Sequence, residues 1–180
     1  MTVMDGVERL PVVGVMGSGS EAHEDRTAPL GHWLAEAGFH LLTGAGGGVM
    51  ASVSRAFSGV IARRGLVIGV VPGRVDDAGH SSFPGYPNPW VEIPIVTHLP
   101  LSGDEGTSPM SRNHINVLSA RVIVALPGGA GTSSEVRLAL RYGRPVVAHV
   151  GGRGEIPGLP DDVTVAPELD EVRAFVLGHV

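Results

Sequence analysis

The segment 127–135, with the sequence PGGAGTSSE, places glycines, hydroxyl side chains and one carboxylate directly after the apolar run 121–126. Glycine lets a ligand approach the main chain closely, and the threonine and serine hydroxyl groups can donate hydrogen bonds to it. The carboxyl group of Glu135 can act as a general acid or base. These residue types indicate a site for an anionic small molecule with a proton-transfer group beside it.

Two further glycine-rich segments occupy equivalent positions. Residues 17–21 (GSGSE) follow the apolar run 11–16, and residues 44–50 (GAGGGVM) follow the run 39–43. If the runs are parallel strands, all three segments lie at the carboxyl edge of one sheet, where open α/β folds bind ligands. Each segment leads into a predicted helix, whose N-terminal N–H groups favour phosphate. The predicted ligand-binding residues are Gly17, Ser18, Gly19, Gly44, Gly46, Gly47, Gly48, Asn113, Pro127, Gly128, Gly129, Gly131 and Thr132.

Other site types lack their motifs. The first glycine-rich segment has no third glycine at the spacing of the dinucleotide fingerprint, and no Gly-Lys-Ser/Thr of a Walker A loop occurs. The eight histidines show no metal-binding spacing, and cysteine is absent. We therefore predict no metal site, and the sequence requires no cofactor.

The apolar runs define the elements that position these residues. Six runs predict strands, at 11–16, 39–43, 66–72, 90–96, 121–126 and 145–150. Helical patterns lie between and after them, at 21–37 (with Pro29 inside it, so that a kink or a start near Pro29 is expected), 48–64, 110–120, 132–142 and 167–177. Nearly continuous apolar strands alternating with helices predict a doubly wound, mainly parallel α/β sheet with helices on both faces. We expect a single domain over 1–180, with a flexible N-terminus at about 1–9 and a long surface loop at 73–88.

Composition limits the partners. The net charge of -5 and the aromatic content of 4% argue against a nucleic-acid surface. The N-terminus lacks the pattern of a secretory signal, and no apolar run approaches the ~20 residues of a spanning helix. We expect a cytoplasmic protein whose partner is a small molecule, with no nucleic acid and no membrane.

Taken together, three segments resemble the LOG-like superfamily, which includes the LONELY GUY phosphoribohydrolases and the molybdenum cofactor carrier proteins. These segments are GSGS, TGAGGGVM (43–50) and SRNHINVLSARVIVALPGGAGTSSE (111–135). The resemblance covers about residues 12–150, and P-G-G-x-G-T-x-x-E at 127–135 is its most specific motif. It implies a Rossmann-like sheet, a nucleotide-type ligand at the glycine-rich loops, and a homodimer.

One motif departs from the hydrolases of that superfamily. They carry Met-x-x-Arg-Lys, whereas this chain has Met110-Ser111-Arg112-Asn113-His114, so that Asn113 takes the place of the catalytic arginine. Arg112 comes one residue earlier, which on a helix is a rotation of about 100°. In this respect the chain resembles the carrier-like branch. The candidate catalytic residues are Glu135 and Arg112.

The sequence leaves several hypotheses open. The first is a binding protein for a phosphorylated nucleotide-like or molybdopterin-type ligand, such as a nucleotide monophosphate or the molybdenum cofactor. The alternative is a nucleoside 5′-monophosphate phosphoribohydrolase, and a third is a nucleotide-sensing regulatory module. At the residue level, Thr132 and Glu135 also match a capping box, which would be a structural role. Arg112 could equally be a solvent-exposed helix residue.

Overall fold

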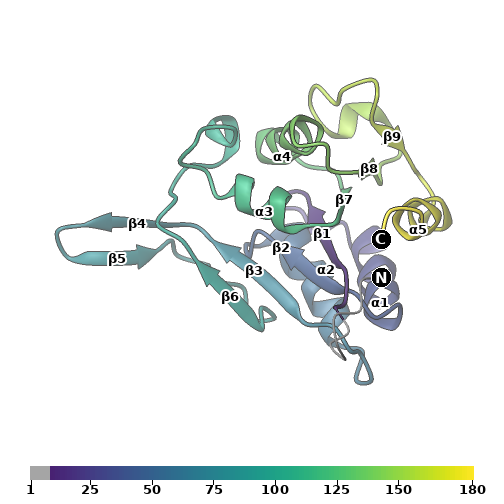
Figure 1. Ribbon diagram of the computed structural model, residues 1–180, viewed down its shortest axis with the longest axis horizontal. Helices are drawn as coiled ribbons and strands as arrows, with labels where there is room; N and C mark the ends of the chain where they lie inside the picture. Colours follow the sequence, from purple (N-terminus) through teal and green to yellow (C-terminus); the bar gives the residue numbers. More distant parts are fainter. Residues whose placement is uncertain (1–8) are drawn as a thin grey trace.

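A seven-stranded, entirely parallel β-sheet forms the centre of the protein (Figure 1). The computed structural model describes residues 9–180, so the predicted flexible N-terminus lies, apart from Arg9, outside the described residues. The sheet order is β6-β3-β2-β1-β7-β8-β9. Its strands are β1 (Val12–Met16), β2 (His40–Thr43), β3 (Val67–Val71), β6 (Ile93–Val96), β7 (Val122–Ala125), β8 (Val146–Ala148) and β9 (Thr164–Val165). The six predicted strands are confirmed, and β9 was missed because it has only two residues.

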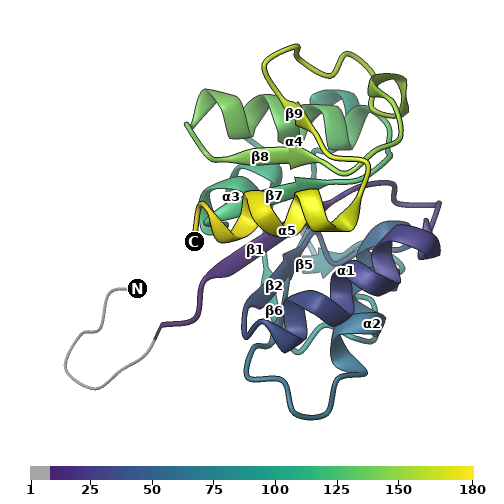
Figure 2. The ribbon, with the colours of Figure 1, turned by 90° about the vertical axis from the view of Figure 1, so that its right-hand side faces the viewer.

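Helices cover both faces of this sheet (Figure 2). One face carries α1 (Glu24–Glu36), α2 (Gly48–Ser58) and α5 (Leu169–Leu177), and the other carries α3 (Asn113–Ser119) and α4 (Ala130–Arg141). Each layer buries its own apolar cluster against the sheet, which explains why the strands read as continuous apolar runs. The predicted doubly wound α/β fold is confirmed. Pro29 lies inside α1, so a helix start near Pro29 is wrong.

The segment 73–88 differs from the predicted loop. Its first part is an antiparallel hairpin of β4 (Gly73–Asp76) and β5 (Gly79–Ser82), which projects from the body of the molecule (Figure 1). Almost all of its side chains are exposed, so it has no buried face and no alternating apolar pattern to announce strands. The residues that follow return to the body. There the N–H of Asn88 donates to Ala45 O (2.8 Å), and its side-chain Nδ2 donates to Gly46 O (2.9 Å).

The strand order reverses direction between β1 and β7. The chain moves from β1 through β2 and β3 to β6 on one side, and from β7 through β8 to β9 on the other. The helices that follow β1 and β7 therefore leave toward opposite faces, and their first residues diverge at the carboxyl edge. Such a switch point is where doubly wound sheets form ligand crevices. Within residues 9–180, no helix combines the length and apolar character needed to cross a bilayer.

We expect Gly31→Ala to destabilise the protein, because α1 packs closely on α2 at this position. A Cβ at Gly31 would lie 2.7 Å from Val53 O and 2.9 Å from the Cβ of Ala56. Overpacking costs about 1–3 kcal/mol, more than the ~1 kcal/mol by which alanine favours a helix over glycine. Thermal unfolding should show a lower Tm for Gly31→Ala and an unchanged Tm for His32→Ala, at an exposed position of the same helix. A raised Tm for Gly31→Ala would contradict this account of the contact.

Candidate functional site

The three glycine-rich loops lock together through the main chain of Ser18. Its N–H donates to Pro127 O (3.0 Å) of the third loop, and its carbonyl accepts from the N–H of Val49 (2.9 Å) at the start of α2. Its Oγ accepts from the N–H of Glu21 (2.9 Å), which closes the first loop on itself. The loops therefore form one rigid assembly at the carboxyl edge. The N–H of Ser18 is used within the protein rather than offered to a ligand.

Six of the predicted ligand-binding glycines make room for the protein itself. At each of them an added Cβ would come within 3.0 Å of a neighbouring protein atom. The neighbours are Val49 for Gly17, the Arg112 guanidinium for Gly44, Met50 and Tyr86 for Gly46, Gly19 O for Gly47, Ser18 O for Gly48, and Thr132 Oγ1 for Gly128. Gly48 also requires φ of +54°, which glycine adopts readily. These glycines build the interlocked loops, and their close approach is to other loops.

Three other glycines border open space. A Cβ at Gly129 would meet nothing within 4 Å, and at Gly19 and Gly131 the nearest atoms would be 3.9 Å away. Gly129 is the N-cap of α4, and no side chain caps this helix. The first N–H groups of a helix have no intrahelical acceptor. The start of α4 thus presents unused N–H groups beside open space.

The capping-box interpretation of Thr132 and Glu135 is wrong. Because α4 begins at Ala130, Thr132 is its third residue rather than its cap. Thr132 Oγ1 is buried and has no hydrogen-bond partner, and the Glu135 side chain accepts from Asn116 instead. A capping role therefore accounts for neither side chain.

Glu135 lies in a buried polar cluster between α3 and α4. Its side chain is 7% exposed, and Asn116 Nδ2 donates to its Oε1 at 2.9 Å. Burial raises the pKa of Glu135 above its ordinary value, although the positive charge of Arg112 and the Asn116 hydrogen bond act in the opposite direction. Within the described chain, Asn116 is the hydrogen-bond partner of this carboxyl group, and it engages Oε1 alone. A carboxyl group with a raised pKa and a second oxygen left for a ligand can hold and release a proton.

Arg112 reaches this cluster despite the rotation of about 100° between neighbouring helix positions. It is the N-cap of α3 with helical dihedral angles (φ -67°, ψ -11°), and its long side chain brings Nη1 to Asn113 Oδ1 (3.4 Å). Its guanidinium lies against Gly44 and 5.8 Å from the centre of the Tyr86 ring, and the residue is only 5% exposed. The alternative of a solvent-exposed arginine is therefore wrong. Tyr86 carried no sequence signal and was missed.

The two residues after Arg112 face different surroundings. Asn113 is buried and donates from Nδ2 to Ser134 Oγ (2.9 Å), which ties α3 to α4. His114 turns away, and its ring nitrogens contact Tyr142 Oη (2.7 Å) and the Ser108 carbonyl oxygen (2.9 Å). His114 therefore lies outside the cluster. Asn116 was missed, although its position three residues after Asn113 on a helix could have signalled it.

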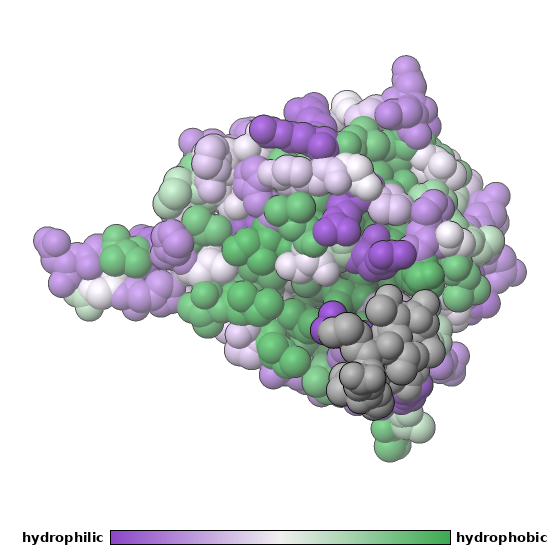
Figure 3. Space-filling model, viewed as in Figure 1, coloured by the Kyte–Doolittle hydropathy of each residue, from purple (hydrophilic) through white to green (hydrophobic). Residues whose placement is uncertain are grey.

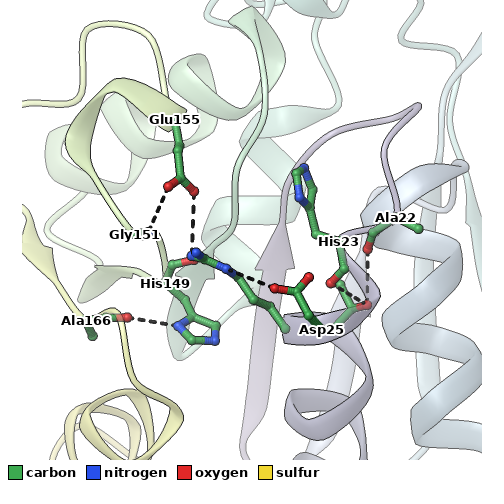
Figure 4. Close-up of polar contacts among 9 residues, drawn as sticks. Ala22, His23, Asp25, His149, Gly151, Glu155 and Ala166 are labelled. Atoms are coloured by element: carbon green, nitrogen blue, oxygen red, sulfur yellow. Dashed lines mark hydrogen bonds and ion pairs between the residues drawn. The ribbon is translucent and has the colours of Figure 1, made fainter.

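A second polar network surrounds Glu155 and His149 (Figure 4), and the main chain of Glu155 also contacts the third loop. The main-chain oxygen of Glu155 accepts from the N–H of Gly128 (3.1 Å), and its Oε1 accepts from the N–H of Gly151 (3.0 Å). Arg26 Nη1 lies 3.6 Å from Glu155 Oε2 and donates to His149 O (2.9 Å). Within residues 9–180, no three His, Asp or Glu side chains are placed to hold a metal ion. The network was not foreseen, because its members are far apart in the sequence.

Two hollows lie on the surface of the protein, and their sizes alone do not show which of them belongs to the functional site. A groove of about 210 Å³ lies beside Ser20 and Gly48 and is lined by Arg55 and Trp90. A larger hollow of about 560 Å³ lies at the opposite edge of the sheet, among residues that precede the strands, such as Pro11 and Arg121. Among the described residues that line the larger hollow, none has a buried side-chain polar atom without a hydrogen-bond partner, in contrast to Arg112, Asn116 and Thr132. The chemistry described above therefore points to the carboxyl edge.

The fold and the loops together define the class of protein. A doubly wound parallel sheet with interlocked glycine-rich loops, and with P-G-G-x-G-T-x-x-E at the start of α4, is a Rossmann-like domain of the LOG-like superfamily. The chain belongs to the SLOG cluster4 family, whose model matches residues 10–162. The predicted resemblance is confirmed.

Individual relatives agree with this assignment. The chain is 30% identical over 142 residues to an uncharacterized protein of Archaeoglobus fulgidus, covering 78% of this chain and 80% of that one. The structure is similar to the molybdenum cofactor binding protein of Rippkaea orientalis, with a TM-score of 0.71, 30% identity and coverage of 96% and 98% of the two chains. It is also similar to the molybdenum cofactor carrier protein of Chlamydomonas reinhardtii, with a TM-score of 0.69, 30% identity and coverage of 94% and 98%.

We expect Glu135→Gln to stabilise the protein at neutral pH. The raised pKa means that the folded protein holds this proton to higher pH than the unfolded chain does. The associated stability is complete below the ordinary value of 4.5 and is lost as the pH rises through the raised value. Glutamine keeps an acceptor for Asn116 and removes the buried charge. A tenfold difference in proton affinity between the folded and unfolded states corresponds to about 1.4 kcal/mol, and each kcal/mol to about 2–4 °C in Tm.

The measurement is Tm against pH for the wild type, Glu135→Gln and Glu36→Gln, the last at an exposed position of α1. The Glu135→Gln curve should rise above that of the wild type with increasing pH and meet it in acid. Glu36→Gln should follow the wild type throughout. A Glu135→Gln variant that is less stable than the wild type at neutral pH would show that the charged carboxylate stabilises the fold.

Proposed function

We propose that this protein is a cytoplasmic binding protein for a phosphorylated, nucleotide-like or molybdopterin-type small molecule. The observation that carries the proposal is the uncapped start of α4, where Gly129 borders open space and Thr132 Oγ1 is buried without a partner. A phosphate there would accept from the free N–H groups and would lie at the positive end of the helix dipole. Arg112 and Glu135 lie on the same side and face the rest of the ligand.

Two further facts support this class of ligand. The chain has a net charge of -5, so attraction of an anion relies on local groups such as the helix start and Arg112 rather than on overall charge. The similar proteins from Rippkaea orientalis and Chlamydomonas reinhardtii are, respectively, a binding protein and a carrier protein for the molybdenum cofactor. A pterin cofactor and a nucleotide both join a planar ring system to a phosphate group, so one phosphate site serves either.

The direct test is native purification followed by denaturation and mass spectrometry of any released compound. Thermal shift measurements with AMP, other nucleotides, pterins and inorganic phosphate complement it. We expect a phosphorylated compound to co-purify or at least one of these ligands to raise Tm. Absence of both would contradict the proposal.

Two neighbouring glycines provide a matched pair of variants. Gly129→Ala places a methyl group in the open space where the phosphate would lie, so it should weaken AMP binding at least tenfold, about 1.4 kcal/mol, with little change in Tm. Gly128→Ala forces a methyl group against Thr132 and the N–H of Ser18, so it should lower Tm. Calorimetric titration and thermal unfolding distinguish the two effects. Equal affinity of the wild type and Gly129→Ala would place the phosphate elsewhere.

The buried carboxyl group of Glu135, with its raised pKa and its Oε2 left for a ligand, favours a second candidate function. In this alternative, the enzyme hydrolyses a nucleoside 5′-monophosphate. The N-glycosidic bond breaks as Glu135 gives a proton to the departing base, and water attacks C1′ of the ribose and returns a proton to the Glu135 carboxylate. The products are free base and ribose 5-phosphate.

The test is release of adenine from AMP by the wild type and by Glu135→Gln. Loss of a general acid lowers the rate by about 10²–10⁴-fold. Adenine release that is lost in Glu135→Gln would establish the hydrolase. If neither protein releases free base from any nucleotide of a panel, the hydrolase is excluded. Neither result affects the binding measurements above.

We also propose a homodimer that buries the outer face of β6. On the side of the sheet that carries α3, the apolar side chains of this edge strand are exposed, with Ile93 at 40% and Ile95 at 38%, and Leu118 of α3 is exposed at 46%. Figure 3 shows apolar surface in this region of the molecule. A contiguous apolar surface on an edge strand favours association with a second copy of the same chain.

Ile95→Glu should therefore convert the dimer to a monomer, because the new carboxylate would be buried without a partner in the interface. Light scattering coupled to size exclusion measures the mass. Leu177→Glu is the control, since Leu177 is exposed on α5 at the opposite face of the sheet and should leave the dimer intact. A monomeric wild type, or a dimer that survives Ile95→Glu, would contradict this interface.

A further inference from the structure

We propose that the ligand carries two anionic groups, of which the first lies at the start of α4 and the second is bound by Arg112. This inference rests on the proposed function and specifies the ligand class of the same site. It makes Arg112 a ligand-binding residue with a position of its own, separate from the phosphate position. Two features of the structure support it. Arg112 has hydrogen-bond donors without partners, and a chain of hydrogen-bonded side chains connects Arg112 to Gly131.

Arg112 is a buried cation whose acceptors are incomplete. In the described chain, no carboxylate oxygen lies within 4.0 Å of its guanidinium, and Nε is buried without any partner. Among the described residues, its one hydrogen bond runs from Nη1 to Asn113 Oδ1, at a long 3.4 Å. A buried guanidinium with unfilled donors is costly unless an anion compensates it. The missing partner is therefore an acceptor with negative charge.

The unfilled donors are arranged on one edge of the guanidinium. Nη1 is directed to Asn113, which leaves Nε–H and one N–H of Nη2 parallel on the neighbouring edge. This fork matches two oxygens of one phosphate, carboxylate or other oxyanion. Gly44 and Tyr86 hold the planar group from its sides, so its direction is fixed before a ligand arrives. The pre-positioned fork lowers the entropy lost on binding.

A chain of hydrogen bonds links Arg112 to the first anion position and separates the two. Arg112 Nη1 donates to Asn113 Oδ1, Asn113 Nδ2 donates to Ser134 Oγ (2.9 Å), and Ser134 Oγ donates to Gly131 O (2.7 Å). Since two side chains, those of Asn113 and Ser134, make up this chain of three hydrogen bonds, we infer that one tetrahedral phosphate does not fill both positions. A nucleoside diphosphate, or a phosphorylated compound with a second oxyanion, has the required two groups.

Acidic groups near the site do not remove the need for the second anion. Glu135 faces the same cluster but lies beyond 4.0 Å from the guanidinium, and its Oε1 is engaged by Asn116. Burial raises the pKa of Glu135, which reduces the negative charge that it can supply to Arg112. Asp104 and Glu105, on the short helix 103–105 beside the start of α4, are outside the buried cluster and form no ion pair with Arg112. A ligand anion remains the partner that the geometry admits.

The test is an NMR titration of the intact protein with inorganic phosphate, followed through the main-chain amides and the arginine Nε–H groups. We expect two responding groups of signals, one from the amides of 129–132 and one from the Nε–H of Arg112. Arg112→Gln should lose one of two bound phosphates and keep the response at 129–132. Gly129→Ala should lose the response of the amides at 129–132 and keep the response of the Arg112 Nε–H. Arg141→Gln, near the end of α4 and away from the cluster, is the control and should keep both.

Diphosphate provides the second measurement, because it can fill both positions at once. It should bind the wild type at least tenfold more tightly than phosphate does, and Arg112→Gln should abolish this difference while its Tm confirms a folded protein. A single responding group at 129–132, unchanged in Arg112→Gln, would overturn the second position and leave the proposed function standing. No response to phosphate, diphosphate or AMP would overturn both.

Discussion

The main chain of Ser18 is the point on which the carboxyl edge of this protein depends. Its N–H and its carbonyl oxygen join the first glycine-rich loop to the third loop and to the start of α2. These bonds require three backbone segments to approach one another more closely than side chains would allow. Glycine at positions 17, 47, 48 and 128 is the physical consequence. With the loops fixed in this way, the start of α4 is held open, and its N–H groups cannot be satisfied from within.

The polar cluster between α3 and α4 is the second constraint. Arg112, Asn116 and Thr132 are each at least nine-tenths buried, and each has a buried side-chain polar atom without a hydrogen-bond partner. Buried polar atoms of this kind are rare in folded proteins and are usually explained by water or a ligand. Because these atoms lie near the uncapped start of α4, the site is already arranged to bind the polar groups of a ligand. The fold itself is secured elsewhere, by the two apolar layers on either face of the sheet.

The departure from the Met-x-x-Arg-Lys motif changes which residues line the site, but a cation and a carboxyl group are still present. Asn113 occupies the position of the hydrolase arginine, and it connects α3 to α4 through Ser134. Arg112 supplies a guanidinium from one residue earlier, because its long side chain lies buried in the same cluster. His114 contacts Tyr142 and the Ser108 carbonyl outside the cluster, so it adds no second cation there. The cluster therefore keeps one cation and one carboxyl group, which suits ligand binding and leaves acid chemistry at Glu135 available.

The sequence by itself determined the sheet and its helices, because continuous apolar strands and glycine-rich strand ends are local patterns with few structural solutions. It also predicted a site at the carboxyl edge and singled out Glu135, Arg112 and the glycine-rich loops. It did not reveal the β4–β5 hairpin, whose exposed residues carry no periodicity, or the roles of Asn116 and Tyr86. Only the tertiary structure decided which glycines face other loops and which face open space. That distinction depends on contacts between segments far apart in the chain, and no local pattern encodes them.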